Sequence, residues 1–252
     1  MNQHHPSFLD NIPPVVKNLL IINVLFFLAT FVFEQALNIN LDEYLGLHFF
    51  RSRDFKIWQL VSYMFMHGSF THLFFNMFAL YMFGSVLEYT WGSKRFLIFY
   101  FITGIGAGLV QELVCAIRLY PLLSQLTPEA VELIKNEGRD VLLSGKNYAN
   151  SVMGDFNLIY NTITVGASGS IFGLLLAFGM LFPNQPLYFM FIPVPIKAKY
   201  FVIGYAILEL LLGVGNFQSD NVAHFAHLGG MFFGYFLIRK WKRDANNHQL
   251  FG

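Results

Sequence analysis

The sequence predicts an all-α polytopic membrane protein, a bundle of six transmembrane helices in a single domain over residues 1–252. Hydrophobic residues make up 55% of the chain and charged residues only 12%, whereas soluble domains carry about 25% charge. Phe alone contributes 30 residues, which suits a surface that faces lipid. The net charge of +1 gives no indication of nucleic-acid binding, so membrane lipid is the partner that the composition predicts.

Six segments are apolar and close to the ~20 residues that a helix needs to cross the hydrocarbon core. In chain order they are 18–37, 71–90, 96–117, 163–182, 198–215 and 222–240. The fourth contains no charged residue, and the fifth is short and carries Glu209. The apolar stretch 186–196 contains Pro193 and Pro195, so we expect it to lie at the membrane interface rather than to span.

Two longer connections separate these segments. The first, 38–70, mixes aromatic and basic side chains and is expected in the headgroup region. The second, 118–160, is a polar extracytoplasmic insertion between the third and fourth helices. Within it, Thr127 and Pro128 suit the N-cap and the first position of a short helix that runs to Lys135.

Lys and Arg predict the orientation of the chain. With six spans both termini share one side, and on that side the basic residues lie close to helix ends in short loops and tails. Both termini are therefore predicted to be cytoplasmic. The first apolar segment is expected to remain as an uncleaved signal anchor in a bacterial inner membrane.

Four polar residues lie at similar depth in the apolar segments. Ser168, Asn76 and His227 are each the sixth residue of their predicted helix, and His72 lies one turn from Asn76. At ~1.5 Å rise per residue, the sixth residue lies roughly 8 Å below the outer edge. Polar groups at that depth are costly unless they are paired or hydrated, so we expect these four to cluster.

A serine, a histidine and two side-chain donors are the components of acyl-transfer chemistry. We expect His227 to take the proton of Ser168 and later to protonate the leaving amine. His72 and Asn76, with the backbone N–H groups of Ala167 and Ser168, would stabilise the oxyanion. No Asp or Glu lies near Ser168 or His227 in the sequence, so we expect a dyad rather than a triad.

Glycines spaced four residues apart accompany both candidate catalytic residues. They are Gly169 and Gly173 in the fourth segment, and Gly230 and Gly234 in the sixth. Such small-xxx-small faces allow two helix backbones to approach closely. If these two faces meet, Ser168 and His227 can come within hydrogen-bond distance.

Three motifs, taken together, resemble the rhomboid family of intramembrane serine proteases. They are Gly166-Ala-Ser-Gly169 around the nucleophile, His72-Leu-Phe-Phe-Asn76, and Ala226-His-Leu-Gly-Gly230 with Gly234. The resemblance covers nearly all of the transmembrane core and leaves out 118–160. It implies a rhomboid-like six-helix bundle with a water-filled cavity open to the outside. It also implies cleavage of single-span transmembrane protein substrates near the outer membrane face, with no metal and no cofactor.

The chain departs from the family pattern at two positions. Where members often have Trp-Arg in the first loop, the sequence reads Trp58-Gln59, which affects the anchoring of that loop. Where members often have a tyrosine four residues after the serine, it has Phe172, which can still stack on the imidazole of His227. His67 also fits a family pattern, and we expect it to position the loop.

Several residues have more than one possible interpretation. Ser168 alone would more often be a helix-packing residue, and His224, one turn before His227, is a rival base that we expect to be a cavity neighbour. Glu88 is expected to tie loops at the cytoplasmic end, and Glu209 to have a buried, hydrogen-bonded role rather than a catalytic one. The alternative functions are a catalytically inactive rhomboid-like protein that binds transmembrane helices, and a transporter.

Overall fold

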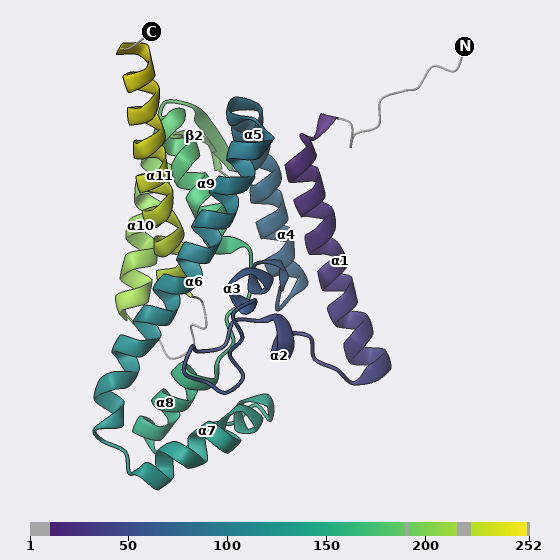
Figure 1. The fold of residues 1–252 in the computed structure, drawn as a ribbon, viewed down its shortest axis with the longest axis vertical. Helices are drawn as coiled ribbons and strands as arrows, with labels where there is room; N and C mark the ends of the chain where they lie inside the picture. Colours follow the sequence, from purple (N-terminus) through teal and green to yellow (C-terminus); the bar gives the residue numbers. More distant parts are fainter. Residues whose placement is uncertain (1–10, 190–191, 216–222, 251–252) are drawn as a thin grey trace.

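The computed structural model describes residues 11–189, 192–215 and 223–250, most of which are helical. In chain order the elements are α1 (Pro14–Leu37), α2 (Asp42–Leu45), α3 (Gln59–Ser62), the 3-10 turn η2 (Tyr63–Phe65), α4 (Phe70–Ala79), the π-helical segment η3 (Leu80–Gly84), α5 (Ser85–Trp91), α6 (Ser93–Leu123), α7 (Pro128–Leu143), α8 (Ser151–Asn161), α9 (Ser168–Leu181), β1 (Pro186–Phe189), β2 (Ile192–Lys197), α10 (Ala198–Gly215) and α11 (His224–Leu250). The long helices run side by side. α1 begins and α11 ends at one end of this bundle, and α7 and α8 lie beyond the other (Figure 1).

Among the described helices, four stretches are long and apolar enough to cross a membrane. They are α1, the continuous run Phe70–Trp91, α6 and α10, which match the first, second, third and fifth predicted segments. α9 has 14 residues and, at ~1.5 Å per residue, is too short to cross ~30 Å of hydrocarbon by itself. α11 carries two histidines at its start and basic residues from Arg239 onward, and it is not one of the four.

The helix that carries Ser168 begins five residues later than the predicted segment 163–182. Leu47 and Thr164 exchange backbone hydrogen bonds of 2.9 and 3.0 Å, so the chain ahead of α9 is extended. Ser168 is therefore the first residue of α9 rather than the sixth, His227 is the fourth of α11, and Asn76 is the seventh of α4. The equal-depth count was wrong because the three helices begin at different points relative to the predicted segments.

The predicted insertion 118–160 corresponds to the end of α6, which runs to Leu123, and to two helices that pack on each other, α7 and α8. The predicted cap is present, since the Thr127 side chain accepts a hydrogen bond from the backbone N–H of Ala130, and the helix continues past Lys135 to Leu143. Asn161 donates to the carbonyl of Ile134 at 2.9 Å.

The insertion is also joined to the first loop. Arg139 Nε donates to Glu43 Oε1 at 2.9 Å. Phe49 of the same loop packs edge-on against Tyr160 of α8 at 5.6 Å between ring centroids. An ion pair and an aromatic contact therefore link the insertion to the segment that leads to the candidate site.

The proline-containing stretch 186–196 does not form a helix. β1 and β2 pair as an antiparallel hairpin with Pro186 opposite Lys197. A proline has no N–H to donate to a helix interior, and a two-stranded hairpin accommodates it at its edge. The prediction that this stretch is not a spanning helix is confirmed.

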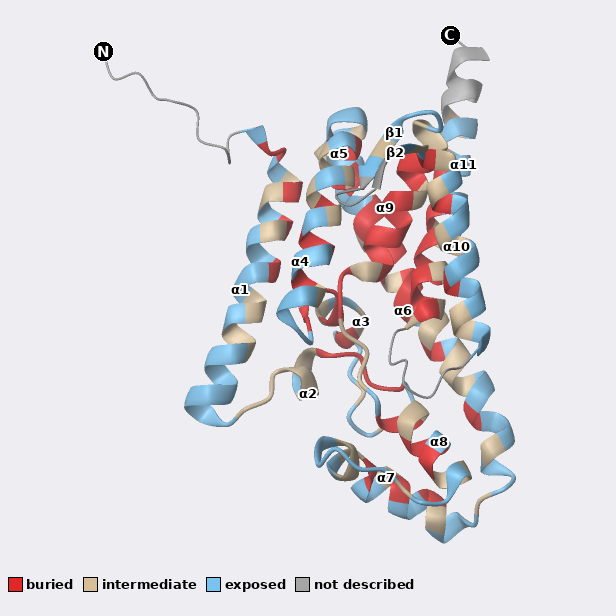
Figure 2. Cartoon of the chain, turned by 180° about the vertical axis from the view of Figure 1, so that it is seen from behind, coloured by how far each residue is buried: buried red, intermediate tan, exposed pale blue. Residues whose placement is uncertain are grey.

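α9 is the most buried helix, and Figure 2 shows its ribbon as almost continuously buried between its neighbours. Glycines make this position possible. A Cβ at Gly169 would lie 2.4 Å from the Ala107 Cβ of α6, and one at Gly173 would lie 2.7 Å from Thr103. A Cβ at Gly230 of α11 would lie 1.9 Å from the carbonyl oxygen of Gly169. The glycines of α11 therefore pack directly against the backbone of α9, and the glycines of α9 also allow α6 to approach closely.

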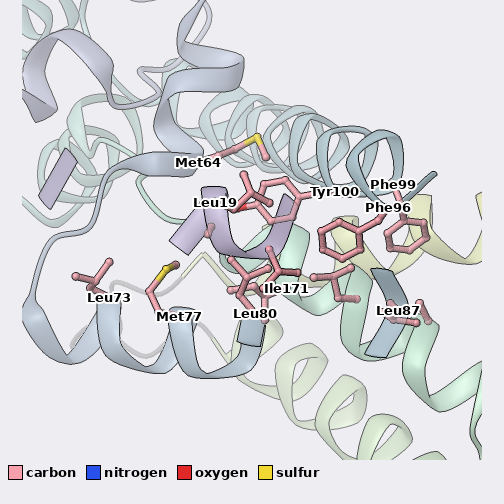
Figure 3. Packing of buried hydrophobic residues seen from close by; sticks show 14 of the residues in the cluster. Leu19, Met64, Leu73, Met77, Leu80, Leu87, Phe96, Phe99, Tyr100 and Ile171 are labelled. Atoms are coloured by element: carbon pink, nitrogen blue, oxygen red, sulfur yellow. The ribbon is translucent and has the colours of Figure 1, made fainter. Parts of the chain in front are cut away.

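The principal hydrophobic core joins helices that are far apart in the sequence. Figure 3 shows Leu19 of α1, Met64 of η2, Leu73 and Met77 of α4, and Tyr100 of α6 converging on one cluster. In contrast, many large apolar side chains on the outside of the bundle are exposed, including Phe75 and Leu211. A surface of this kind suits a lipid environment.

α1 is attached to the bundle through its first half. Glu88 accepts hydrogen bonds from the backbone N–H groups of Val15 and Val16 at 3.0 and 2.8 Å, and from the Ser93 hydroxyl at 2.7 Å. These N–H groups lie in the first turn of α1, where a helix supplies no partner of its own. Every residue of 31–37, in contrast, is exposed. Glu88 therefore ties the start of α1 to the connection between α5 and α6, and the prediction that this end is cytoplasmic stays a prediction.

Gln59 anchors the first loop at the position where the family often has arginine. Its side chain is 1% exposed, and its Oε1 accepts from the backbone N–H of Lys56 at 3.0 Å. Its Nε2 donates to the carbonyl of Asp54 at 3.1 Å. The loop is therefore held by a neutral amide, which replaces the cation that the motif would supply.

Candidate active site

Ser168 is positioned by backbone hydrogen bonds on the chain that precedes it. The N–H of Gly166 donates to the carbonyl of Tyr63 at 2.8 Å, and the Tyr63 hydroxyl donates to the carbonyl of Gly104 in α6 at 2.7 Å. Gly166 has φ +126°, a backbone conformation that side-chain-bearing residues rarely adopt. The turn therefore requires glycine, and it delivers Ser168 to the first position of α9.

His227 approaches Ser168 from α11. Its Nε2 lies 2.8 Å from the Ser168 hydroxyl oxygen, a distance at which a neutral imidazole accepts a hydroxyl proton. His227 is buried, while Ser168 is partly accessible. The ring of Phe172 lies against that of His227, with centroids 4.1 Å apart and planes inclined by 5°. Phe172 also stacks on Tyr205 of α10 at 5.1 Å.

Glu209 of α10 is an acid in the site that the predicted Ser168–His227 dyad does not include. Its Oε2 lies 2.9 Å from Nδ1 of His227 and 2.6 Å from Nδ1 of His224. The expectation of a buried, hydrogen-bonded Glu209 is confirmed, but the expectation that no acid reaches His227 was wrong. Glu209 and His227 are 18 positions apart in the sequence, and they come into contact because α10 and α11 pack together.

A signal for this contact was present in the sequence. Glu209 is the one carboxylate in an otherwise apolar segment, and ionisable residues within spans usually face a partner inside the bundle. Ala198, Val202 and Glu209 are the buried residues of α10, and their spacing of four and seven places them on one face. That face is directed at α9 as well as α11, since a Cβ at Gly179 of α9 would lie 2.7 Å from Val202.

The two histidines of α11 have different partners. His227 reaches Ser168 and Glu209, whereas His224 lies one turn earlier and contacts Glu209. The rings of His224 and His227 are perpendicular, with centroids 6.3 Å apart. This geometry favours His227 over His224 as the partner of Ser168.

His72 and Asn76 of α4 border the turn that carries Ser168. A Cβ built on Gly166 would lie 2.8 Å from Cε1 and Nε2 of His72 and 3.7 Å from Nδ2 of Asn76. Asn76 is 7% exposed, and its Nδ2 has no hydrogen-bond partner among the residues that the structure describes. A buried donor without a partner costs about 1–3 kcal/mol, so Asn76 Nδ2 is a candidate to donate to a bound group.

His67 lies behind His72 in the loop ahead of α4. The two rings meet edge to face, with centroids 5.0 Å apart. Burial, followed by the neighbouring His72, lowers the pKa of His67 to about 4, so its imidazole is neutral at physiological pH. His67 therefore supports the ring of His72 without adding charge to the site.

One group of side chains in the described part of the chain has the geometry to hold a metal ion. Glu209, His224 and His227 offer three ligand atoms within 4.8 Å of one another. The hydrogen bonds between these same atoms already account for their proximity. The arrangement is thus explained as a hydrogen-bonded cluster.

These residues together have the chemical capacity for acyl transfer. A serine hydroxyl lies on a histidine base, the base is in turn oriented by a carboxylate, and a donor without a partner lies beside the same turn. The sequence profile of the rhomboid domain matches residues 54–120 and 141–242, which make up most of the chain. The chain belongs to the rhomboid family.

Curated relatives agree with this assignment. The chain is 28% identical over 216 residues to an uncharacterized mitochondrial rhomboid protein of Schizosaccharomyces pombe, covering 75% of this chain and 52% of the relative. It is 26% identical to the chloroplastic Rhomboid-like protein 11 of Arabidopsis thaliana, covering 79% and 61%. It is 28% identical to Rhomboid protease AarA of Providencia stuartii, covering 75% and 59%.

These relatives bear on two further points. The chain spans about half to three fifths of the length of the three relatives named. Rhomboid membership and the apolar helices make it a membrane protein. The expected bacterial inner membrane is not supported, because two of these relatives are named as mitochondrial and chloroplastic.

Proposed function

We propose that this rhomboid is an intramembrane serine endopeptidase that cleaves single-span transmembrane proteins near the outer membrane face. The observation that carries the proposal is the 2.8 Å contact between Ser168 Oγ and His227 Nε2. Attack of the hydroxyl on a peptide carbonyl transfers its proton to His227, which then protonates the leaving amine. No metal or cofactor is needed for this sequence of steps.

The donors beside Gly166 suit the oxyanion of the tetrahedral intermediate. Asn76 Nδ2 has no partner among the described residues, and the His72 ring lies on the same side of the turn. The N–H groups of Ala167 and Ser168 are at the start of α9, where backbone donors lack intrahelical partners and the helix dipole favours negative charge. Converging donors of this kind stabilise charge only as it develops.

The proposed topology has six spans, in which α9 together with the extended chain ahead of it, and α11, complete the four that qualify by length and composition. α9, α11 and the run Phe70–Trp91 begin on the side of α7 and α8, opposite to the end where α1 begins and α11 ends (Figure 1), and Ser168, His227 and Asn76 lie within the first two turns of these helices. With the termini cytoplasmic, the site would open to the extracytoplasmic side and the insertion would lie over it.

A fluorophosphonate probe tests the nucleophile directly. In purified protein reconstituted into liposomes, we expect the wild type to be labelled and to cleave a single-span substrate, and Ser168→Ala to do neither. Ser170→Ala is the matched control, because Ser170 lies half a turn away in the same helix and donates to the carbonyl of Tyr100 at 2.7 Å. Equal labelling of the wild type and Ser168→Ala would exclude Ser168 as the nucleophile.

An unlabelled wild type that still binds a transmembrane helix would favour the alternative, a catalytically inactive rhomboid-like protein. The described geometry gives the Ser168 hydroxyl an acceptor at hydrogen-bond distance, which such a protein does not need.

A further inference from the structure

We propose that Glu209 is a positioning residue that fixes His227 as the base of Ser168, so that the site works as a Ser168–His227–Glu209 triad. This inference rests on the proposed function for its effect on turnover, and on the hydrogen bonds alone for its effect on His227. Two contacts join the three residues in a continuous chain, with 2.8 Å from Ser168 to His227 and 2.9 Å from His227 to Glu209.

The stacked ring of Phe172 fixes the plane of the imidazole but does not decide which nitrogen carries the proton. A parallel ring at 4.1 Å contacts His227 in the same way in either tautomer. A carboxylate, in contrast, can only accept, so Nδ1 of His227 must carry a hydrogen to bond Glu209. Nε2 is then left without a hydrogen and can accept the proton of Ser168.

The position of Glu209 also explains how a carboxylate is tolerated in α10. It is 5% exposed, and an isolated ionised group within a span is costly. The N–H groups of His224 and His227 both point at its Oε2, at 2.6 and 2.9 Å, and this pairing offsets the cost. His224 thus provides a second partner for the carboxylate oxygen that His227 contacts.

The carboxylate has a second effect once His227 accepts a proton. The imidazolium that forms lies 2.9 Å from a negative group, and because both side chains are buried, the opposite charges attract more strongly than in bulk solvent. Glu209 therefore stabilises the charge that develops with the tetrahedral intermediate. It acts through His227 and does not touch the reacting carbonyl.

Glu209→Gln is the decisive variant, because it keeps the size of the side chain and removes its charge. The amide of glutamine can donate to Nδ1 and so select the tautomer in which Nε2 carries the hydrogen. We expect kcat to fall on the order of 10²–10⁴-fold with little change in KM, and fluorophosphonate labelling to slow in parallel. Glu209→Asp, which keeps the carboxylate, should recover at least tenfold of that loss.

Two controls separate positioning from folding. Glu88→Gln removes a buried carboxylate at the other end of the bundle and should lower the melting temperature without lowering kcat. His224→Ala removes the second imidazole and should retain more activity than Glu209→Gln. Wild-type kcat in Glu209→Gln would overturn the inference, as would equal losses in the Gln and Asp variants at an unchanged melting temperature.

Nuclear magnetic resonance of the imidazole protons tests the inference without catalysis. In the wild type labelled with ¹⁵N-histidine, we expect a hydrogen-bonded Nδ1–H signal from His227 that disappears in Glu209→Gln. A His227 signal that is unaffected by Glu209→Gln would overturn the inference. If the wild type neither cleaves nor labels, the proposed function fails, and this spectrum alone decides the role of Glu209.

Discussion

A methyl group placed on Gly230 would lie 1.9 Å from the carbonyl oxygen of Gly169. Two helix backbones are therefore in direct contact one turn from the Ser168–His227 hydrogen bond, which joins the same two helices. Gly230→Ala must force α11 away from α9, since neither backbone can move as a flexible side chain would. We expect loss of cleavage and a lower melting temperature, measured on the purified protein in detergent.

Gly204→Ala is the matched control for that substitution. Gly204 lies inside α10, and a Cβ there would meet nothing within 4 Å. Alanine is favoured over glycine in a helix interior by ~1 kcal/mol, so this variant should keep its activity and melt at the same or a higher temperature. Full activity in Gly230→Ala would contradict the described contact between the two helices.

Asn76→Ala tests the oxyanion donors. The buried amide Nδ2 has no partner among the described residues, so its removal should cost little stability and should lower kcat by about 10²–10³-fold. KM should change little, because the bond would form only as the oxyanion develops. Asn23→Ala is a comparison in α1, where the amide donates to the carbonyl of Leu19 at 2.7 Å. An Asn76→Ala variant with wild-type kcat would remove this residue from the oxyanion site.

His67 makes the stability of the protein dependent on pH. Its folded-state pKa is lowered to about 4 from 6.5, so between these values the unfolded chain binds more protons than the folded one. Stability from this group is therefore complete above about pH 6.5 and is lost as the pH falls toward 4, by up to about 3 kcal/mol. Melting temperatures at steps between pH 7 and 4 should fall less in His67→Gln than in the wild type. Parallel curves for the two proteins would rule out this contribution.

Glu88→Gln tests the attachment of α1. The carboxylate accepts from two backbone N–H groups and one hydroxyl, and glutamine has only one accepting oxygen. We expect a loss of about 1–3 kcal/mol in stability, measured by thermal melting, with kcat retained. Glu132→Gln on the exposed surface of α7 should change stability by less than about 1 kcal/mol, because solvent screens its pair with Lys135. Equal melting temperatures in both variants would argue against the role of Glu88.

The parts of the fold and of the site that could be predicted were those that depend on residues close together in the sequence. The Ser168 and His227 motifs, the Thr127 cap and the bounds 198–215 of α10 all depend on residues within a turn or two of one another. The start of α9 could not be predicted, because it is set by hydrogen bonds between Thr164 and the distant Leu47.

Glu209 was not connected to His227 for a similar reason. Nothing within one helix shows which imidazole a carboxylate will meet when the partner lies 18 positions away across the 216–222 segment. The same holds for Gln59, whose side-chain hydrogen bonds anchor the loop at the position where the family pattern has arginine. In each of these places a tertiary contact decides what the local pattern leaves open.

The way α1 is held has a structural consequence. Its buried residues, Val16, Leu19 and Asn23, all lie in its first half, where Glu88 binds its first turn, and every residue of 31–37 is exposed. α1 is thus attached to the bundle at one end, while the side chains at its other end are exposed. From Asn38 the chain continues into the loop that ends at Tyr63, whose carbonyl accepts a hydrogen bond from the N–H of Gly166, two residues before Ser168. The exposed end of α1 is thus connected to the turn that holds Ser168 through one loop and one backbone hydrogen bond.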